Sequence, residues 1–390
     1  MSVKTKKRRV CFVITSFIHY SRGFLILDEL NKRKDIELYV AVAGTALLSK
    51  YSSKRAHIRE LLEADGINNI HEVHFNLEGD SHFIKAKTAG LGIMEFTNLF
   101  NNIKPDAIVL RGDRFEVLSA AISASYLHIP IAHIEGGDVT GTIDESVRHS
   151  ITKLSHIHFT TNEPARKRVL KMGEDDKFVF NFGSPDIEVV KKVADSSSKF
   201  NFLSTGSGAD IDINKPYIMV MYHPVTSESD KMGEYTRDLL EVINDLNIQT
   251  FWFWPNFDSG SESISYELRY FNDEVRGHKI RFMRYLPPKD FIYMLKNSMC
   301  LVGNSSAGLK ECSFLGVPVV NIGTRQGRRL RDKNVVNTSY EKESLRKAIK
   351  KQINKGKYPE SDLYNSEDTA KNIANTLATL SLYVQKNFKG

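Results

Sequence analysis

The chain has 390 residues, which is longer than the roughly 250 to 300 residues over which one hydrophobic core grows, so two domains are expected. Its hydrophobic fraction of 41% and charged fraction of 26% exclude collagen-like, mucin-like and disordered chains. The net charge of +7 is concentrated at the start of the chain. Five basic residues there predict a solvated terminus rather than a nucleic-acid-binding arm, and no nucleic-acid partner is expected: Lys4, Lys6, Lys7, Arg8 and Arg9.

The cysteines and the apolar runs indicate the cellular compartment. None of the three cysteines falls in a CxxC pair, which indicates a reducing compartment and argues against structural zinc: Cys11, Cys300 and Cys312. The early run VCFVITSFI imitates a signal peptide, but His19, Arg22 and Asp28 follow it without a small-residue cleavage site. No apolar run approaches the ~20 residues that span a bilayer. We therefore expect a cytoplasmic protein with no membrane partner.

Short β-branched and aromatic runs alternate with helical patterns, which predicts parallel sheets built from βαβ units. Most of these runs are apolar on both faces, as strands covered by helices on both sides must be. In the first half the predicted strands are 10–15, 37–43, 107–110, 129–134, 158–161 and 178–182, and the predicted crossover helices are 84–102 and 116–126. In the second half the predicted strands are 217–222, 250–254, 280–283, 299–302 and 317–322.

The domain boundary is predicted in the segment 194–214, which is rich in Ser, Gly and Asp and lacks apolar periodicity. The expected fold class is α/β, with two doubly wound Rossmann-like domains and a cleft between them. We place the N-terminal domain at 1–195, the C-terminal domain at 205–363 and a final helix at 364–390. Ser366 is the predicted N-cap of that helix, and its apolar stripe is expected to pack on the N-terminal domain: Ile373, Leu377 and Leu380.

Ligands of open parallel sheets bind at the carboxyl ends of the strands. After one predicted strand comes the turn 303–308, GNSSAG, followed by a helix expected toward Glu311. Free backbone N–H groups and the hydroxyls of Ser305 and Ser306 predict a diphosphate site, with an ordinary Ser-capped helix as the alternative. Arg325 and the arginines after it supply planar donors for phosphate. The chain has neither GxGxxG after its first strand nor a P-loop motif, so we expect no NAD, no ATP and no other cofactor.

Carboxylates follow the predicted strands of the first half. Asp113, Glu135 and Asp144 are expected at one sheet edge with Arg114 and His149. Each alone would be a cap or an ion-pair partner, but close carboxylates raise one another's pKa, which suits proton transfer near neutral pH. The spacing indicates no metal site, and His133, on a predicted strand, is expected in the core.

Five motifs carry a family resemblance: RGDRFE, HIEGGDVTGTIDESVRH, YHPVTSE, NFDSGS and GNSSAGLKECSFLGVPVVNIGTRQGRR. From about residue 8 to 337 the chain resembles the hydrolysing UDP-N-acetylglucosamine 2-epimerases of sialic-acid and surface-polysaccharide synthesis. It also resembles the related enzymes that act on UDP-2,4-diacetamido sugars in legionaminic-acid synthesis. The resemblance implies a GT-B type fold, a dimer or tetramer, and a UDP-sugar bound by Arg114, His223, Asn256, Ser305, Ser306, Glu311 and Arg325.

The resemblance also implies a reaction. The family removes the C2 proton and expels UDP from C1 to give a 2-acetamidoglucal, and then adds water to yield free N-acetylmannosamine. The acid/base set implied here is Asp113, Glu135 and Asp144, with His149 nearby, and the role of each carboxylate stays open. Such chemistry needs a base near C2, charge stabilisation at the departing diphosphate and a proton donor.

One departure from the family pattern affects the substrate. Where the family has Asn-Arg-Ala-Asp-Tyr in the loop after its first strand, this chain has 16–20, SFIHY, and loses a cation and a carboxylate that Arg22 replaces only in part. The alternatives are the same reaction on UDP-2,4-diacetamido-2,4,6-trideoxy-glucose, a non-hydrolysing 2-epimerase, an inverting glycosyltransferase of the same fold, and a non-catalytic nucleotide-sugar sensor. The RGDRFE and IEGGDVTGTIDES motifs favour hydrolysis, and the three carboxylates argue against the last two alternatives.

Overall fold

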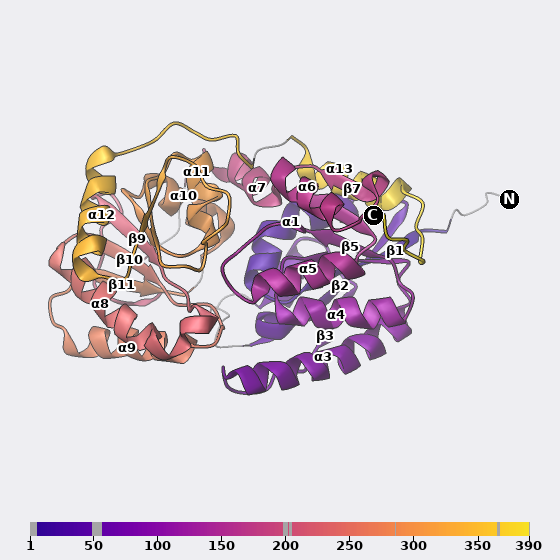
Figure 1. The fold of residues 1–390 in the computed structure, drawn as a ribbon, viewed down its shortest axis with the longest axis horizontal. Helices are drawn as coiled ribbons and strands as arrows, with labels where there is room; N and C mark the ends of the chain where they lie inside the picture. Colours follow the sequence, from indigo (N-terminus) through magenta and orange to yellow (C-terminus); the bar gives the residue numbers. More distant parts are fainter. Residues whose placement is uncertain are drawn as a thin grey trace.

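A computed structural model describes residues 6–48, 57–197, 202, 205–284, 286–364 and 367–389. It contains two sheets that lie side by side along the long axis of the molecule, each flanked by helices (Figure 1). Part of the predicted linker and the predicted N-cap Ser366 lie outside the described residues. The domain limits 1–195, 205–363 and 364–390 therefore stay predictions.

The first sheet is built from the N-terminal half of the chain. It has seven strands in the order β3-β2-β1-β4-β5-β6-β7, and every pairing is parallel. This order extends the Rossmann order 3-2-1-4-5-6 by one strand. Its elements are β1 (Arg8–Ile14), α1 (Phe17–Asn31), β2 (Ile36–Ala43), η1 (Gly44–Leu47), α2 (Ile58–Ala64), β3 (Ile70–Val73), α3 (His82–Ile103), β4 (Ala107–Arg111), α4 (Phe115–Tyr126), β5 (Ile131–Ile134), α5 (Asp144–Leu154), β6 (Ile157–Thr160), α6 (Glu163–Lys171), η2 (Asp176–Phe178), β7 (Val179–Asn181) and α7 (Pro185–Val193).

The second sheet repeats this topology in the order β14-β13-β12-β9-β10-β11-β8. All pairings are parallel except that of the two-residue strand β8 with β11. Its elements are β8 (Ser207–Gly208), β9 (Tyr217–Met221), η4 (Thr226–Lys231), α8 (Met232–Asp245), β10 (Gln249–Phe253), α9 (Ser261–Glu274), β11 (Ile280–Met283), α10 (Pro288–Asn297), β12 (Leu301–Gly303), η5 (Ser306–Gly308), α11 (Glu311–Phe314), β13 (Val319–Ile322), β14 (Val335–Thr338) and α12 (Lys342–Lys355), and the final helix is α13 (Thr369–Thr379).

The α/β prediction is confirmed, and all eleven predicted strands are present with ends within two residues of the expected ones. Strands β3, β8 and β14 were not predicted; they form sheet edges and are short and exposed at least in part. The expectation of a loop at 16–20 was wrong. Ser16 is the N-cap and Phe17 the first residue of α1, so this segment is the start of a helix rather than a loop.

Helices bury both faces of each sheet. In the N-terminal half α3, α4 and α5 cover one face, with Phe96, Val117 and Ile151 in the core, while α1 and α13 cover the other. Helix α7 lies between the two halves (Figure 1), because Val189 packs into the N-terminal core and Val190 into a core of the C-terminal half. The start of α7 is thereby placed where the halves meet.

The end of the chain returns to the N-terminal half. Helix α12 lies on the C-terminal half, and the chain then crosses back so that α13 and the C-terminus lie beside the first sheet (Figure 1). In α13, Ile373 and Leu377 are buried in the same core as α1, and Leu380 packs against it as the residue that ends the helix. Across the parts of the chain that the structure describes, no helix combines the length and apolar character needed to cross a membrane.

Candidate active site

One pocket lies at the point where the strand order of both sheets reverses. It has a volume of about 260 Å³ and is lined by Ser16 after β1, Arg114 after β4, His223 after β9 and Ser305 after β12. These are the carboxyl ends of the two central strands of each sheet, where open α/β sheets bind ligands. All seven residues predicted to bind the UDP-sugar line it: Arg114, His223, Asn256, Ser305, Ser306, Glu311 and Arg325.

The turn after β12 is shaped by glycine and by one amide side chain. Gly303 has a φ of 135°, and a Cβ there would lie 2.1 Å from the carbonyl oxygen of Met221, so only glycine fits. The side chain of Asn304 accepts from the backbone N–H of His223 and donates to its carbonyl oxygen, both at 2.8 Å. Arg325 in turn donates to the carbonyl oxygen of Asn304 at 3.2 Å. The ends of β9 and β12 and the Arg325 loop are thus joined into one unit.

The helix predicted toward Glu311 is present but short. Ser306–Gly308 form a single 3₁₀ turn, and α11 has only four residues. The Ser305 hydroxyl accepts from the N–H of Ala307 at 3.3 Å and caps that turn. The turn therefore offers individual N–H groups and hydroxyls, without the dipole of a long helix.

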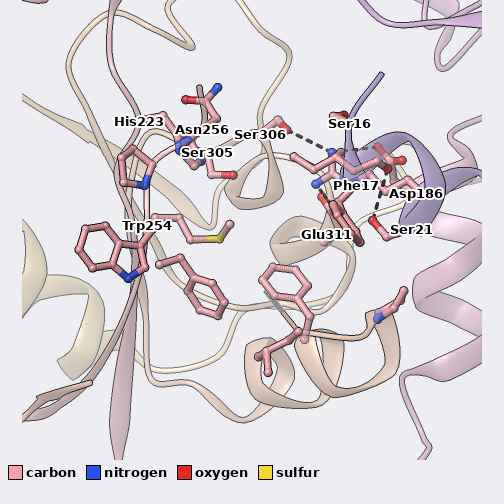
Figure 2. Close-up of a pocket in the computed structure, with 18 of the residues that line it drawn as sticks. Ser16, Phe17, Ser21, Asp186, His223, Trp254, Asn256, Ser305, Ser306 and Glu311 are labelled. Carbon is pink, nitrogen blue, oxygen red and sulfur yellow. Dashed lines mark hydrogen bonds and ion pairs between the residues drawn. The ribbon is translucent and has the colours of Figure 1, made fainter. Parts of the chain in front are cut away.

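Arg22 reaches from α1 across the pocket to the C-terminal half. Its guanidinium donates to Glu311 Oε1 at 2.5 Å and to the Ser306 hydroxyl at 3.4 Å, and it lies 3.7 Å from Asp186 (Figure 2). Burial raises the pKa of Glu311, while Arg22 opposes this rise. The second oxygen of Glu311, Oε2, is buried with no hydrogen-bond partner among the described residues. This oxygen is therefore an acceptor that the described protein groups leave unpaired.

The other end of the pocket is aromatic and apolar. Phe253, Trp254 and Phe291 line it, and the Arg284 guanidinium lies 5.3 Å from the Trp254 ring centroid. Trp254 lies well away from Glu311 and Asp186 (Figure 2). A ligand with a planar ring at one end and anionic groups at the other matches this division, because aromatic side chains stack on planar rings.

The four residues predicted to be catalytic are not part of this lining. Among the described residues that line the pocket, Asp113, Glu135, Asp144 and His149 are absent. They lie on the segments that follow β4 and β5 and on α5. Each carboxylate has a partner outside the predicted set: Arg148 for Asp113, Lys310 and Arg111 for Glu135, and Thr142 for Asp144.

Glu135 is held by two cations. Lys310 donates to Glu135 Oε1, and the Arg111 Nε lies 3.3 Å from Oε2. Burial would raise the pKa of Glu135, but Lys310 and Arg111 outweigh it and hold that pKa well below its usual range. The prediction that neighbouring acids raise its pKa is therefore wrong for Glu135. Asp113 is likewise ion-paired, with Arg148.

Asp144 differs from the other two acids. Burial and the nearby carboxylate of Asp258 raise its pKa, while Thr142 donates to it at 3.0 Å. Asp258 belongs to the C-terminal half and lies 3.5 Å from Lys85 and 3.9 Å from Arg325. The raised pKa that the sequence analysis expected thus occurs at Asp144, but a residue outside the predicted set contributes to it.

The two histidines of this region are neutral near pH 7. Burial and then Arg148 lower the pKa of His149, whose nearest carboxylate, Glu145, is 4.0 Å away. His133 is fully buried, with Nε2 2.8 Å from the carbonyl oxygen of Gly112, which confirms its predicted place in the core. The described residues contain no group of three or more His, Cys, Asp or Glu side chains placed to ligate a metal ion.

Comparison with known proteins places this geometry in a family. The model of a family described as UDP-N-acetylglucosamine 2-epimerase matches residues 28–378. The chain belongs to the UDP-N-acetylglucosamine 2-epimerase family. It is 30% identical over 378 residues to the UDP-N,N'-diacetylbacillosamine 2-epimerase (hydrolyzing) of Legionella pneumophila, covering 97% of each chain. It is 32% identical over 371 residues to the UDP-N-acetylglucosamine 2-epimerase of Neisseria meningitidis, covering 93% of this chain and 94% of that one.

Solved structures of UDP-N-acetylglucosamine 2-epimerases share the fold. The structure of the Neisseria meningitidis UDP-GlcNAc 2-epimerase bound to UDP-GlcNAc matches with a TM-score of 0.74 at 17% identity, over 95% of this chain and 99% of that chain. The Methanocaldococcus jannaschii UDP-GlcNAc 2-epimerase, solved in complex with UDP-GlcNAc and UDP, gives the same TM-score and the same coverage. The predicted arrangement of two Rossmann-like domains of GT-B type is confirmed.

Sequence reasoning missed several polar residues of this family member's site. Lys310, Asp186 and Asn304 are almost fully buried. Lys310 contacts the predicted residue Glu135, Asn304 contacts the predicted residue Arg325, and Asp186 pairs with Lys310 and lines the pocket. Asn304 and Lys310 lie inside the GNSSAGLKE motif, and Asp186 follows β7. Their positions after strands could therefore have indicated from the sequence that they belong to the site. Their partners were not visible, because Lys310 and Glu135 are 175 residues apart.

Proposed function

We propose that the chain is a hydrolysing 2-epimerase that converts UDP-N-acetylglucosamine to N-acetylmannosamine and UDP. The observation that carries this proposal is that one pocket contains all seven residues expected to bind the UDP-sugar, with Arg114 and Arg325 contributed by opposite halves. The three carboxylates expected to transfer protons lie on the segments beside it. The hydrolysing relative in Legionella pneumophila, matched over 97% of both chains, supports the same reaction type.

In the proposed complex the nucleoside diphosphate lies in one orientation. The base lies against the aromatic end formed by Phe253, Trp254 and Phe291. The diphosphate then reaches the Ser305–Ser306 turn, where charge-assisted hydrogen bonds from Arg325 stabilise it as it departs. The free Oε2 of Glu311 accepts from a ribose hydroxyl.

The chemistry follows from the charge states of the carboxylates. Glu135 is ionised, so it accepts the C2 proton as the C1–O bond breaks and its electron pair leaves with UDP, which gives the glucal. Water then adds its oxygen to C1 of the glucal, and a proton is delivered to C2 on the opposite face. Asp144, with its raised pKa, supplies that proton and regains one from the water. Glu135 releases the proton taken from C2 to solvent, which restores its ionised state for the next turnover.

Proton NMR in D₂O tests the proposal directly. Purified protein with UDP-N-acetylglucosamine is expected to release UDP and free N-acetylmannosamine carrying deuterium at C2. A UDP-linked product would identify a non-hydrolysing epimerase instead. A disaccharide, formed only after an acceptor sugar is added, would identify a glycosyltransferase. Binding of UDP without any turnover of UDP-sugars would identify a sensor.

A second substrate is supported by the start of α1. Phe17 and Ile18 line the pocket where the family motif carries Arg and Ala, so this wall is apolar. An apolar wall favours a sugar with fewer hydroxyls, such as UDP-2,4-diacetamido-2,4,6-trideoxy-glucose, and the Legionella pneumophila relative is named for such a sugar. Measuring kcat/KM for both sugars decides between them. A higher kcat/KM for the trideoxy sugar would identify that sugar, in place of UDP-N-acetylglucosamine, as the substrate.

The assembly and the location of the chain are proposed on the same family grounds. We propose a cytoplasmic dimer or tetramer with domains at 1–195 and 205–363 and a helix at 364–390. Light scattering of the purified chain measures the assembly, and a monomeric mass would contradict it. Limited proteolysis is expected to cut first between 195 and 205, and first cuts elsewhere would move the boundary.

A further inference from the structure

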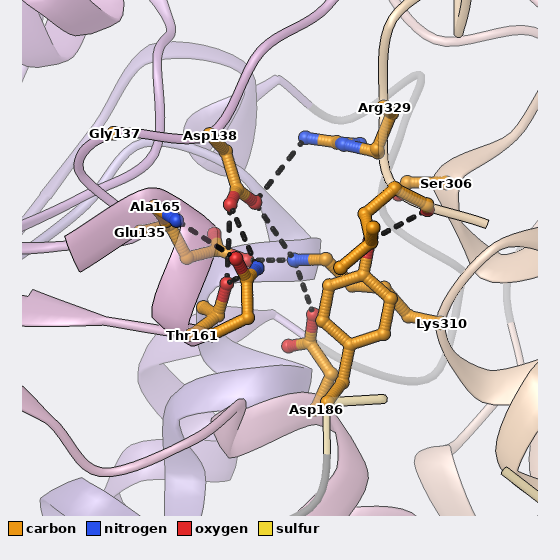
Figure 3. Close-up of polar contacts among 12 residues, drawn as sticks. Glu135, Gly137, Asp138, Thr161, Ala165, Asp186, Ser306, Lys310 and Arg329 are labelled. Carbon is orange, nitrogen blue, oxygen red and sulfur yellow. Dashed lines mark hydrogen bonds and ion pairs between the residues drawn. The ribbon is translucent and has the colours of Figure 1, made fainter. Parts of the chain in front are cut away.

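Lys310 occupies an unusual position for a lysine. Its side chain is only 2% exposed and comes from the segment between η5 and α11, yet its ammonium contacts carboxylates of the N-terminal half. It donates to Glu135 Oε1 and to Asp186 Oδ2, the latter at 3.4 Å, and it lies 3.8 Å from Asp138 (Figure 3). A buried lysine is rare unless it is paired, so these contacts account for its charge at this site.

The charges around Lys310 form a balanced set. Four cations face four carboxylates where the halves meet: Lys310, Arg111, Arg22 and Arg329 against Glu135, Asp138, Asp186 and Glu311. Lys310 touches three of the four carboxylates. Removing its charge would leave an uncompensated negative charge in a buried region, and that charge would raise the pKa of the carboxylates that remain.

The two carboxylate oxygens of Glu135 each face a cation. Its Oε1 accepts from Lys310, and its Oε2 faces Arg111 at 3.3 Å, so the plane of the carboxylate is set by one cation from each half. Its backbone has a φ of 71°, in the left-handed region that residues with a Cβ rarely adopt. Backbone and side chain are therefore both held in one arrangement.

The backbone of Lys310 is tied to the predicted diphosphate turn. Its N–H donates to the carbonyl oxygen of Ser306 at 3.1 Å, and Ser306 lines the pocket. The same residue thus connects the turn that binds the leaving group with the carboxylate that accepts the proton.

We propose that Lys310 is a positioning residue, which holds Glu135 ionised and oriented from the opposite half of the molecule and couples it to the Ser306 turn. This inference rests on the proposed function. Lys310 acts through Glu135 and contacts no reacting atom. A lysine with a purely structural role would stabilise the junction of the halves without affecting the ionisation of Glu135.

The pH dependence of Glu135 depends on every charged group that faces it. The cations are Lys310, Arg111, Arg22 and Arg329, and the facing carboxylate is Asp186. His19 and His133 also lie near it, but burial lowers the pKa of each, to about 3 and about 4, so both are neutral at the working pH. The Tyr364 ring, 5.8 Å from the Lys310 ammonium, is un-ionised. Lys310 is thus the cation whose loss is expected to raise the pKa of Glu135 most.

The test compares Lys310→Met and Lys310→Arg with the wild type, in kcat, KM, UDP affinity and the pH profile of kcat. Lys310→Met is expected to lower kcat at least about 10-fold, with UDP affinity within about 3-fold of the wild type. The acid limb of its kcat profile should move up by about one pH unit or more, because Glu135 loses its nearest cation. Lys310→Arg keeps the charge, so its acid limb should stay at the wild-type position.

A double-mutant cycle separates positioning from stability. In a Glu135→Gln background, Lys310→Met should lower kcat by less than about 3-fold further, because the group it acts on is already neutral. Lys386→Met is the matched control, since it removes a lysine 2.7 Å from the buried Glu174, at the far edge of the N-terminal half. It should lower the melting temperature and leave kcat unchanged. A wild-type pH profile in Lys310→Met, or full additivity with Glu135→Gln, would overturn the proposal.

Failure of the proposed function gives a different result. If wild-type protein turned over no UDP-sugar, the hydrolysing activity would be rejected, and with it the proposed effect of Lys310 on catalysis. The pairing of Lys310 with Glu135 can still be tested by measuring the melting temperatures of the same four variants as a function of pH. Lys310→Met should lower the melting temperature near pH 7 when Glu135 is present and change it little in the Glu135→Gln background. Equal losses in both backgrounds would reject the pairing as well.

Discussion

Asp80, from the N-terminal half, caps helix α9 of the C-terminal half: its Oδ2 accepts from the backbone N–H of Glu262 at 3.2 Å. Its carbonyl oxygen also accepts from the Ser259 hydroxyl at 2.7 Å. Because the capping carboxylate comes from the other half of the molecule, the stability of α9 depends on contact between the two halves.

Asp80→Ala is therefore expected to affect both stability and substrate binding. Loss of the cap should reduce the free energy of unfolding by ~1 kcal/mol in urea denaturation. It should also raise KM, because the halves that line the pocket lose a contact. Ser81→Ala is the matched control, because Ser81 caps α3 within its own half. An equal rise in KM in both variants would show that the link across the halves has no role in binding.

Glu135→Gln and Asp113→Asn should abolish most of the turnover and leave nucleotide binding intact. We expect kcat to fall about 10²-fold or more, since each change neutralises a carboxylate proposed to act in proton transfer. Calorimetric UDP affinity should stay near the wild-type value, because neither residue lines the pocket. Normal turnover in either variant would remove that residue from the mechanism.

Arg325→Ala should weaken UDP binding by roughly 10- to 100-fold, the effect of losing one charge-assisted hydrogen bond. Arg328 lies on the same loop with a side chain 72% exposed and pairs with Glu145, so Arg328→Ala serves as the control. Its UDP affinity should change by less than about 3-fold. Unchanged UDP affinity in Arg325→Ala, measured by calorimetry, would contradict its assigned role.

The alkaline limb of activity should depend on Asp258. Asp144 donates a proton in the proposed mechanism, so kcat falls as the pH rises through its raised pKa. Removing the negative charge of Asp258 lowers the pKa of Asp144, and Asp258→Asn should therefore move the alkaline limb of the kcat profile to lower pH. Asp212→Asn, at an exposed turn, should leave the limb in place. A limb that stays fixed in Asp258→Asn would exclude Asp144 as the donor.

Acid should destabilise the chain through Glu174. Burial would raise the pKa of Glu174, but His158, Lys153 and Lys386 lower it to about 2. A carboxylate with a depressed pKa in the folded state stabilises the fold above its unfolded pKa, near 4.5, and this contribution disappears as the pH falls toward about 2. Denaturation at pH 7 and pH 3 should show a loss on the order of 2 kcal/mol that is smaller in Glu174→Gln. An equal loss in both proteins would assign the acid sensitivity to other groups.

Much of the fold and of the binding set was predictable from local pattern. Central strands such as β4 and β9 are continuous apolar runs because helices cover both faces, so their sequence alone identifies them. Residues after those strands, such as His223 and Ser305, were expected at the carboxyl edge and do line the pocket. Edge strands such as β3 carry polar residues on their exposed side, and that pattern does not separate them from loops.

The charge state of the site was decided by the tertiary structure alone. The sequence by itself determined that Glu135 and Asp144 follow strands in the same half, but it assigned both the same raised pKa. Folding places Lys310, 175 residues away, on Glu135 and brings Asp258 near Asp144, so the two pKa values move in opposite directions. A pKa depends on burial and on charges within a few ångströms in space, and neither quantity can be read from spacing along the chain.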